Sequence, residues 1–136
     1  MIKQEERRVE PILRAEKLTK RFGELTANRE IDIEIHAGEI HAIAGENGAG
    51  KSTLMKMLYG VYQPTAGNLY IDGEKMERWN PTIAREKGIG MVFQDFRLVP
   101  AFTVLENVFL SLHSAGWKIS KKKLRDEINR ISAEYR

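Results

Sequence analysis

The chain has 136 residues, of which 42% are hydrophobic and 30% are charged, and this composition excludes a disordered or fibrous protein. The length allows one domain with a substantial core, and the absence of cysteine excludes a disulfide scaffold and a thiolate metal site. The net charge of +3 arises from interleaved basic and acidic residues, which does not indicate nucleic acid as a partner.

Residues 1–10 are mostly charged and are expected to form a flexible N-terminus. They contain no apolar core of the kind that a signal peptide needs, and no apolar run of membrane length follows them. A cytoplasmic location is therefore the default prediction.

The next part of the sequence predicts an antiparallel β element. A strand is expected over residues 12–18, and Gly23 marks the turn that follows. Ile31, Ile33 and Ile35 then alternate with polar residues, which is the period of a half-exposed strand.

The central feature is the stretch from Glu39 to Leu58. Between Gly45 and Ser52 the sequence matches the pattern G-x-x-x-x-G-K-S/T of a phosphate-binding loop. An apolar run over residues 40–44 predicts a buried strand before the loop, and apolar residues at helical spacing predict a helix after it. The order strand, glycine turn and helix is the context in which this motif binds phosphate.

The residue types of this loop suit a triphosphate. Glycines allow the backbone to approach an anion closely, so that successive N–H groups can converge on phosphate oxygens. A helix that starts near Lys51 adds unpaired N–H groups and the positive end of its dipole. Lys51 can reach the outer phosphates, and the Ser52 hydroxyl is placed to ligate Mg2+. The alternative is an ordinary glycine turn between a strand and a helix.

Alternating elements follow the loop. Gly60 is expected to end the first helix, and a short strand is predicted over residues 68–71. Asn80 before Pro81 predicts an N-cap and a short helix to about residue 87, which Gly88 stops. The apolar run over residues 89–93 predicts an interior strand, so that the alternation indicates a parallel sheet.

Two further helices are predicted in the last part of the chain. Thr103 and Glu106 form a capping box, so a helix should begin there and run to about Leu112. A final amphipathic helix is expected from about Ser120. The basic run Lys121-Lys122-Lys123 lacks stacking aromatic residues beside it and is interpreted as a solvated helix start, so no nucleic acid is expected as a partner.

Three motifs in order make this chain resemble the ATPase subunits of ATP-binding cassette (ABC) transporters. The phosphate loop resembles the Walker A variant of that family, Lys20-Arg21-Phe22-Gly23 resembles its aromatic loop, and Met91-Val92-Phe93-Gln94 resembles its Q-loop. The resemblance covers residues 12 to about 113. With the segment Leu58–Tyr62, it is greatest to the importers of simple sugars or nucleosides.

The resemblance implies an α/β fold of the P-loop NTPase class. A parallel sheet flanked by helices would form the core, an antiparallel β layer would precede it, and a helical subdomain would begin near the C-terminus. In these terms residues 11–136 are a partial ABC-type nucleotide-binding domain, in which residues 117–136 begin the helical subdomain.

The resemblance also implies ATP and Mg2+ as cofactors. Phe22 would stack on adenine, Lys51 and Gln94 would act in catalysis, and Ser52 and Gln94 would contact the metal. The residues implied to bind the nucleotide are Phe22, Gly45, Glu46, Asn47, Gly48, Ala49, Gly50, Lys51, Ser52 and Thr53. Phe22 could instead fill the antiparallel layer, and Gln94 could be a hydrogen-bonding group at a strand end.

The implied partners are transmembrane permease subunits and a second nucleotide-binding domain in a head-to-tail dimer. The protein would then lie in the cytoplasm, on the inner face of the cell membrane, and would couple ATP hydrolysis to substrate import. The signature segment, the Walker B strand and the switch histidine that family members carry after the Q-loop do not occur in this sequence. The chain is therefore expected to be a fragment that binds ATP but hydrolyses it poorly.

Two rival functions remain open at this stage. A small-molecule kinase with the same loop could use Asp95, which follows the second predicted interior strand, as an acid linked to magnesium. A nucleotide-sensing module could instead bind ATP without turnover and change its affinity for a partner.

Overall fold

The computed structural model of the chain describes residues 10–95, 98–114, 118 and 120–135. These residues form two compact units, of which the first ends at Met91 and the second begins at Val92. Residues 1–9, the main part of the predicted N-terminal tail, lie outside the described residues.

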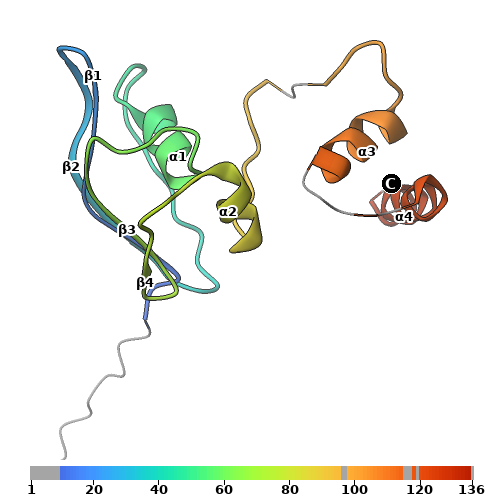
Figure 1. Cartoon of the computed structure of the whole chain (residues 1–136), viewed down its shortest axis with the longest axis horizontal. Coiled ribbons are helices and arrows are strands. Elements are labelled where there is room, and N and C mark those ends of the chain that lie inside the picture. The colour runs from blue at the N-terminus through green and yellow to red at the C-terminus, as the bar shows by residue number, and fades with distance from the viewer. Residues whose placement is uncertain (1–9, 96–97, 115–117, 119, 136) are drawn as a thin grey trace, which may run out of the picture. The chain divides into compact units, whose positions relative to one another are not determined.

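The first unit contains a four-stranded antiparallel sheet with the strand order β2-β1-β3-β4 (Figure 1). The strands are β1 (Leu13–Phe22), β2 (Leu25–Ile35), β3 (Ala66–Ile71) and β4 (Glu74–Lys75). The turn at Gly23 is confirmed, with φ of 58°. β1 is longer than predicted because its pairing with β2 continues to the tip of the hairpin, where Phe22 lies opposite Leu25. The predicted antiparallel layer is therefore confirmed.

A bulge at Lys17 decides which side chains of β1 reach the core. Leu13 and Ala15 are buried at alternate positions, whereas the next buried side chain is that of Leu18. Lys17 has φ of 47°, and the pairing of β1 shifts on both sides of it, between Ala15 and Leu18 toward β2 and between Glu16 and Thr19 toward β3. The extra residue changes the phase of the alternation. The Asp32 carboxylate accepts a hydrogen bond of 2.7 Å from the Lys17 N–H, which gives this group a partner where the pairing of the strands is interrupted.

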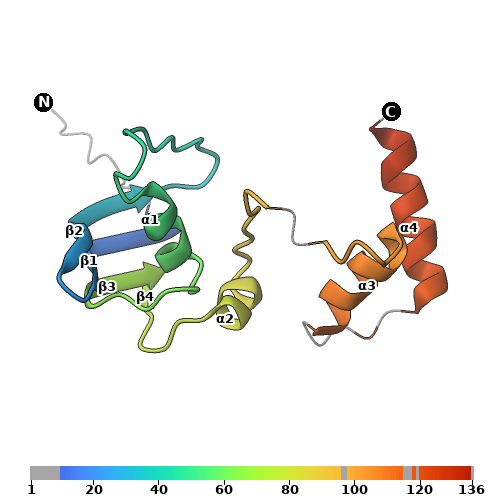
Figure 2. The same cartoon turned by 90° about the horizontal axis from the view of Figure 1, so that it is seen from above.

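Helix α1 (Lys51–Leu58) lies over one face of this sheet (Figures 1 and 2). Its buried side chains are Leu54, Met57 and Leu58. The helix ends before Gly60, as predicted, because Gly60 adopts φ of 85° and the Val61 N–H reaches back to the Lys56 carbonyl at 2.8 Å. This pattern of bonds is a Schellman motif, which satisfies the last carbonyl groups of the helix.

Helix α2 (Pro81–Glu86) has the predicted N-cap. The Asn80 side chain accepts hydrogen bonds from the N–H groups of Thr82 and Ile83 at 2.9 and 3.0 Å. Gly88, with φ of 81°, follows the helix, as predicted.

Two segments that were predicted as interior strands, residues 40–44 and 89–93, do not belong to the sheet of the described residues. Ile40 is 99% exposed and Val92 is 90% exposed, which is the opposite of the expected burial. A parallel strand needs a neighbour that pairs with its backbone and elements that cover both of its faces. Neither segment has a paired strand in the described part of the chain, so the apolar runs stay extended and unpaired there.

The second unit contains α3 (Val104–Ser114) and α4 (Lys121–Glu134), which pack against each other. Ser120 is the N-cap of α4, as predicted, and Leu124 is buried. Further along the same helix face, Tyr135 is 81% exposed. Within the described ranges, no helix combines the length and the apolar character needed to cross a lipid bilayer.

The first turn of α3 carries the predicted capping box. The Thr103 N–H and hydroxyl donate to the Glu106 carboxylate at 2.9 and 2.8 Å, and the Glu106 N–H donates to the Thr103 hydroxyl oxygen at 3.3 Å. The hydrogen bond from the Thr103 backbone, and then that from its hydroxyl, lower the pKa of Glu106 below its ordinary value.

Acidification should therefore loosen the start of α3. A carboxylate whose pKa is lower in the folded than in the unfolded chain stabilises the fold above the unfolded pKa, and this contribution is lost as the pH falls through the folded pKa. We expect NMR titration to show Glu106 protonating below the ordinary glutamate range, with fraying of α3 over the same interval. Thr103→Ala should raise the pKa of Glu106, and an unchanged titration in this variant would contradict the assignment.

Candidate functional site

The loop between Gly45 and Gly50 leads directly into α1. Gly48 and Gly50 have φ of 87° and 89°, and the Ala49 N–H donates to the Glu46 carbonyl at 3.2 Å. Residues with a Cβ rarely adopt these angles, so the glycines of the motif determine the shape of the loop.

The N-terminus of α1 is open to a ligand. Gly50 is the N-cap residue, and the helix start has no hydrogen bond from a capping side chain. The Leu54 N–H donates to the Gly50 carbonyl at 2.9 Å, so the N–H groups of Lys51, Ser52 and Thr53 precede the first bond of the helix. These groups and the positive end of the helix dipole favour an anion at this position.

The Lys51 side chain folds back over the loop. Its ammonium group donates hydrogen bonds of 2.7 Å to the carbonyl oxygens of both Gly45 and Glu46. A phosphate would offer this ammonium charged oxygens in place of neutral carbonyls, and hydrogen bonds between two charged groups are the stronger ones. The loop therefore holds the Lys51 ammonium group in a position where it can bind a phosphate.

Ser52 is exposed at the first turn of the same helix. Mg2+ takes oxygen ligands in proteins and keeps several positions for water or phosphate, so a single hydroxyl suits it when a nucleotide supplies the remaining oxygens. In the ranges that the structure describes, no group of three histidine, aspartate or glutamate side chains is arranged to hold a metal ion. The donor set thus fits a metal that binds together with the phosphates.

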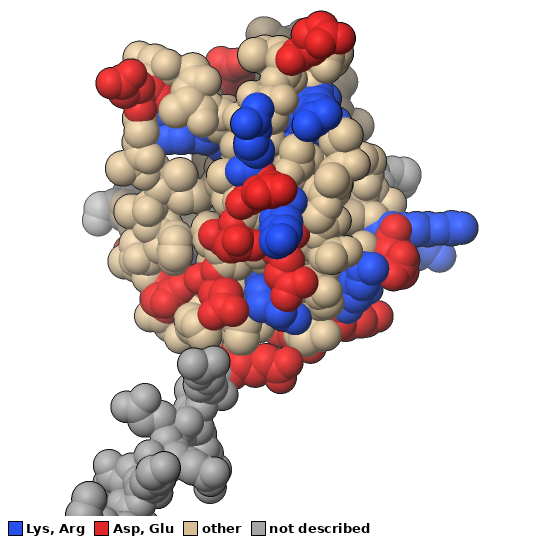
Figure 3. Space-filling model, turned by 90° about the vertical axis from the view of Figure 1, so that its left-hand side faces the viewer, with Lys and Arg blue, Asp and Glu red and all other residues tan. Residues whose placement is uncertain are grey.

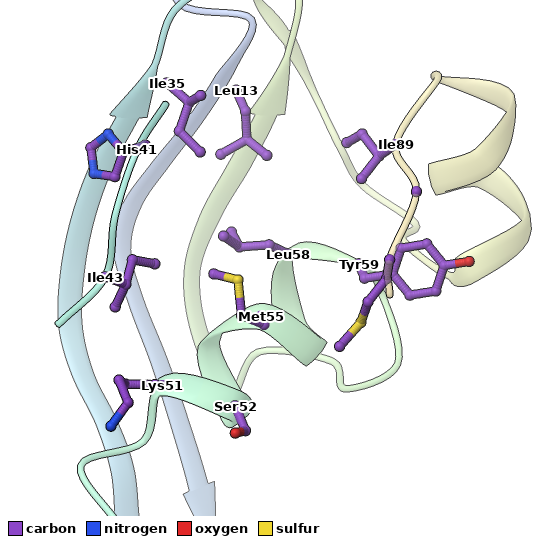
Figure 4. A pocket seen from close by; sticks show the side chains of 12 residues that line it. Leu13, Ile35, His41, Ile43, Lys51, Ser52, Met55, Leu58, Tyr59 and Ile89 are labelled. Atoms are coloured by element: carbon purple, nitrogen blue, oxygen red, sulfur yellow. The ribbon is translucent and has the colours of Figure 1, made fainter. Parts of the chain in front are cut away.

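A hollow of about 470 Å³ lies beside the loop, with Lys51 and Ser52 at one end (Figure 4). Much of its wall is apolar, formed by Leu13, Ile35, Ile43, Met55, Leu58 and Ile89. Ile43 and Ile89 face it from the two extended segments that were predicted as parallel strands. An apolar wall cannot satisfy a triphosphate, so the loop at the edge of the hollow is the candidate phosphate site.

Phe22 lies at the end of β1, and its side chain is 42% exposed. The tip of the β1–β2 hairpin and the loop that enters α1 lie at the same end of the first unit (Figure 1). The partial exposure of Phe22 differs from that of the sheet's core residues, such as Leu18, which is 1% exposed. Adenine stacking by Phe22 remains a prediction.

Asn28 on β2 is a candidate site residue that sequence reasoning missed. It is buried, and its amide group donates to the Gly50 carbonyl at 3.3 Å. A Cβ on Gly50 would lie only 2.3 Å from the Ala27 carbonyl oxygen, so β2 directly backs the loop. The Asn28 Oδ1 is buried and has no hydrogen-bond partner among the described residues. In the sequence, Asn28 is a single amide residue in a strand of alternating apolar and polar residues. Such a residue is too common in strands to indicate a site.

The other predicted site residues fall into two groups. Glu46 and Asn47 are exposed on the loop, and Thr53 lies on the first turn of α1. Gln94 and Asp95 are exposed residues of the second unit. Their proposed roles in catalysis and metal binding remain predictions.

Basic and acidic side chains are interleaved on the face of the molecule that Figure 3 shows. This face therefore lacks the broad positive area that nucleic-acid binding requires. The absence of a nucleic-acid partner remains a prediction from the sequence.

The chain is similar in sequence to proteins of known family. A family model described as "ABC transporter" matches residues 28–136. The guanosine import ATP-binding protein NupO of Bacillus subtilis (strain 168) is 44% identical over 119 residues, which are 87% of this chain and 23% of that protein. The ribose import ATP-binding protein RbsA 3 of Rubrobacter xylanophilus is 48% identical over 131 residues, which are 93% of this chain and 26% of that protein. The chain thus spans about a quarter of the length of the curated relatives it matches.

Solved structures give the same result for the fold. An ATP-binding cassette solved as a dimer, in a post-hydrolysis state with ADP and phosphate, matches with a TM-score of 0.68 and 32% identity over 84% of this chain and 53% of the other. A second cassette, solved in its ADP conformation, matches with a TM-score of 0.69 and 31% identity over 79% of this chain and 42% of the other. The fold class predicted from the sequence is confirmed by these matches, although the described residues form only its antiparallel layer, the loop and the helices.

Proposed function

Because the chain belongs to the ABC transporter family, we propose that it forms the ATP-binding part of a subunit that drives the import of a small sugar or nucleoside. The observation that carries this proposal is the bonding of the Lys51 ammonium to two loop carbonyls, in front of an uncapped helix. The class of cargo is supported by the similarity to the relatives named for guanosine and ribose import.

The proposed roles follow from the position of each residue in the first unit. The backbone N–H groups from Gly48 to Thr53 would bind the phosphates, and Lys51 would exchange its carbonyl partners for phosphate oxygens. The Ser52 hydroxyl would hold Mg2+, whose charge would offset that of the phosphates. Phe22 would stack on the adenine, and the ring is available for this because it is partly exposed.

Hydrolysis requires more groups than these residues supply. The reaction depends on simultaneous positioning of water, metal and hydrogen-bond donors around the terminal phosphate. The proposed sources of the remaining groups are Gln94, the rest of the cassette and a second cassette in a head-to-tail dimer. One of the matching cassettes is described as dimeric. ATP binding and hydrolysis would be coupled to import through contact with transmembrane permease subunits, on the inner face of the membrane.

The proposal is tested by titrating the purified chain with a fluorescent ATP analogue, with folding verified by circular dichroism. We expect saturable binding with Mg2+ that unlabelled ATP and inorganic triphosphate both displace, and phosphate release much slower than that of a complete cassette. A folded chain that does not bind the analogue would refute the ATP-binding role. Turnover at the rate of a complete cassette would refute the proposed dependence on other segments.

A further inference from the structure

Two aromatic rings and two ammonium groups, from the end of β1, from α1 and from the segment after α1, come together in a compact group. Its members, called the tip cluster below, are Phe22, Tyr62, Lys20 and Lys56. The rings of Phe22 and Tyr62 meet edge to face, with centroids 5.4 Å apart and an angle of 77° between their planes. This is one of the geometries that aromatic pairs prefer.

The two ammonium groups lie over these rings. Lys20 Nζ is 5.1 Å from the centre of the Phe22 ring and 5.7 Å from that of Tyr62, and Lys56 Nζ is 5.4 Å from the centre of Tyr62. All three distances are within the range of a cation–π interaction. Lys20 therefore occupies one face of the Phe22 ring.

Hydrogen bonds attach the end of β1 to the chain segment that follows α1, which includes Tyr62. Lys20 Nζ donates to the Gln63 carbonyl at 2.7 Å, and the Arg21 N–H donates to the Thr65 hydroxyl at 3.0 Å. Residues 62–65 and the end of β1 thus support each other, although the residues in contact are 40 or more positions apart in the sequence. The segment that carries Tyr62 is therefore held against the end of β1 that carries Phe22.

We propose that Tyr62 and Lys20 are positioning residues for a purine base, an inference that rests on the proposed ATP-binding function. Tyr62 restricts the Phe22 ring to one orientation, and Lys20 covers one of its faces, so that a base can stack only on the other. Ordering the ring before binding lowers the entropic cost of stacking. The cation also withdraws electron density from the ring, which favours an electron-rich purine on the opposite face.

A purely structural role for the cluster makes a different prediction. If Tyr62 and Lys20 only stabilise the end of the sheet, their loss weakens folding but does not discriminate between ligands with and without a base. If they position Phe22, their loss weakens the binding of ATP and leaves that of inorganic triphosphate unchanged. The ratio of the two affinities therefore separates these roles.

The test compares the dissociation constants of MgATP and magnesium triphosphate for the full chain and its variants. We expect Tyr62→Leu to weaken ATP binding by about 3- to 10-fold, the range that loss of one aromatic pair gives. Its affinity for triphosphate should stay within about twofold of that of the unmodified chain, as expected for a contact that the phosphates do not share. Tyr62→Phe should restore ATP binding, because it keeps the ring, and Lys20→Met should act in the same direction as Tyr62→Leu.

Tyr70→Leu is the matched control. Tyr70 also lies under a cation, with the Arg14 guanidinium 4.1 Å from its ring centre, but Arg14 is near the start of β1, at the opposite end from Phe22, and Tyr70 is its pairing partner on β3. This variant should leave both dissociation constants unchanged. Equal loss of ATP and triphosphate binding in folded Tyr62→Leu, or no loss at all, would overturn the inference. Failure of the unmodified chain to bind ATP would instead refute the proposed function.

Discussion

Replacing Lys51 with alanine should lower the affinity for ATP by about 100-fold or more, because two or more charge-assisted hydrogen bonds to phosphate are lost at roughly 1.5–3 kcal/mol each. The unmodified Lys51 ammonium is already at the mouth of the loop, bound to the carbonyls of Gly45 and Glu46 at 2.7 Å. Only a change of partner is needed when phosphate enters. Isothermal titration with MgATP measures the effect.

Lys75→Ala is the control for this prediction. Lys75 lies on β4 and pairs with the exposed carboxylate of Glu77 at 3.4 Å, so it shares the charge of Lys51 but not its position. Its loss should leave the affinity for ATP unchanged. Equal affinities of Lys51→Ala and the unmodified chain for ATP would show that the loop does not bind the phosphates.

Replacing Gly50 with alanine should destabilise the first unit by about 2–5 kcal/mol, as the sum of left-handed strain and steric overlap. Gly50 has φ of 89°, and a Cβ there would lie 2.3 Å from the Ala27 carbonyl oxygen and 2.9 Å from the Asn28 amide nitrogen. Both neighbours belong to β2, whose ladder prevents the backbone from moving away. Urea denaturation measures the loss of stability, as a lower midpoint of unfolding with an unchanged dependence of the unfolding free energy on urea concentration.

Gly48 provides a matched comparison in the same loop. Its φ is 87°, but a Cβ there would meet nothing within 4 Å. Gly48→Ala should therefore cost only the backbone strain, about 1–2 kcal/mol. If both variants lost the same stability, the close packing of β2 against the loop would not be the cause.

The elements that the sequence predicted correctly depend on contacts between near neighbours. The Asn80 cap of α2 and the Thr103 box of α3 each join residues two or three positions apart. The turn at Gly23 and the helix end at Gly60 likewise depend on the backbone angles of one residue. Such interactions are encoded in a few consecutive residues, and a pattern can therefore predict them.

The extended segments 40–44 and 89–93 show where this reasoning fails. Their apolar runs are those of interior strands, but a strand exists only when another strand pairs with it. The described residues provide no such neighbour for them. The apolar pattern therefore shows that a segment is able to form an interior strand, whereas pairing with another strand decides whether it forms one.

The candidate site divides in the same way. The sequence by itself determined the glycine angles and the start of α1, because both depend on consecutive residues, and the structure adds the hydrogen bond from Lys51 to Gly45, which spans six positions. Only the tertiary structure decided that Asn28 contacts Gly50 and that the Tyr62 ring contacts that of Phe22. In each of these contacts, the two residues are separated by at least 22 positions in the sequence. They arise from the packing of β2 against the loop and of the segment after α1 against β1, which no local pattern encodes.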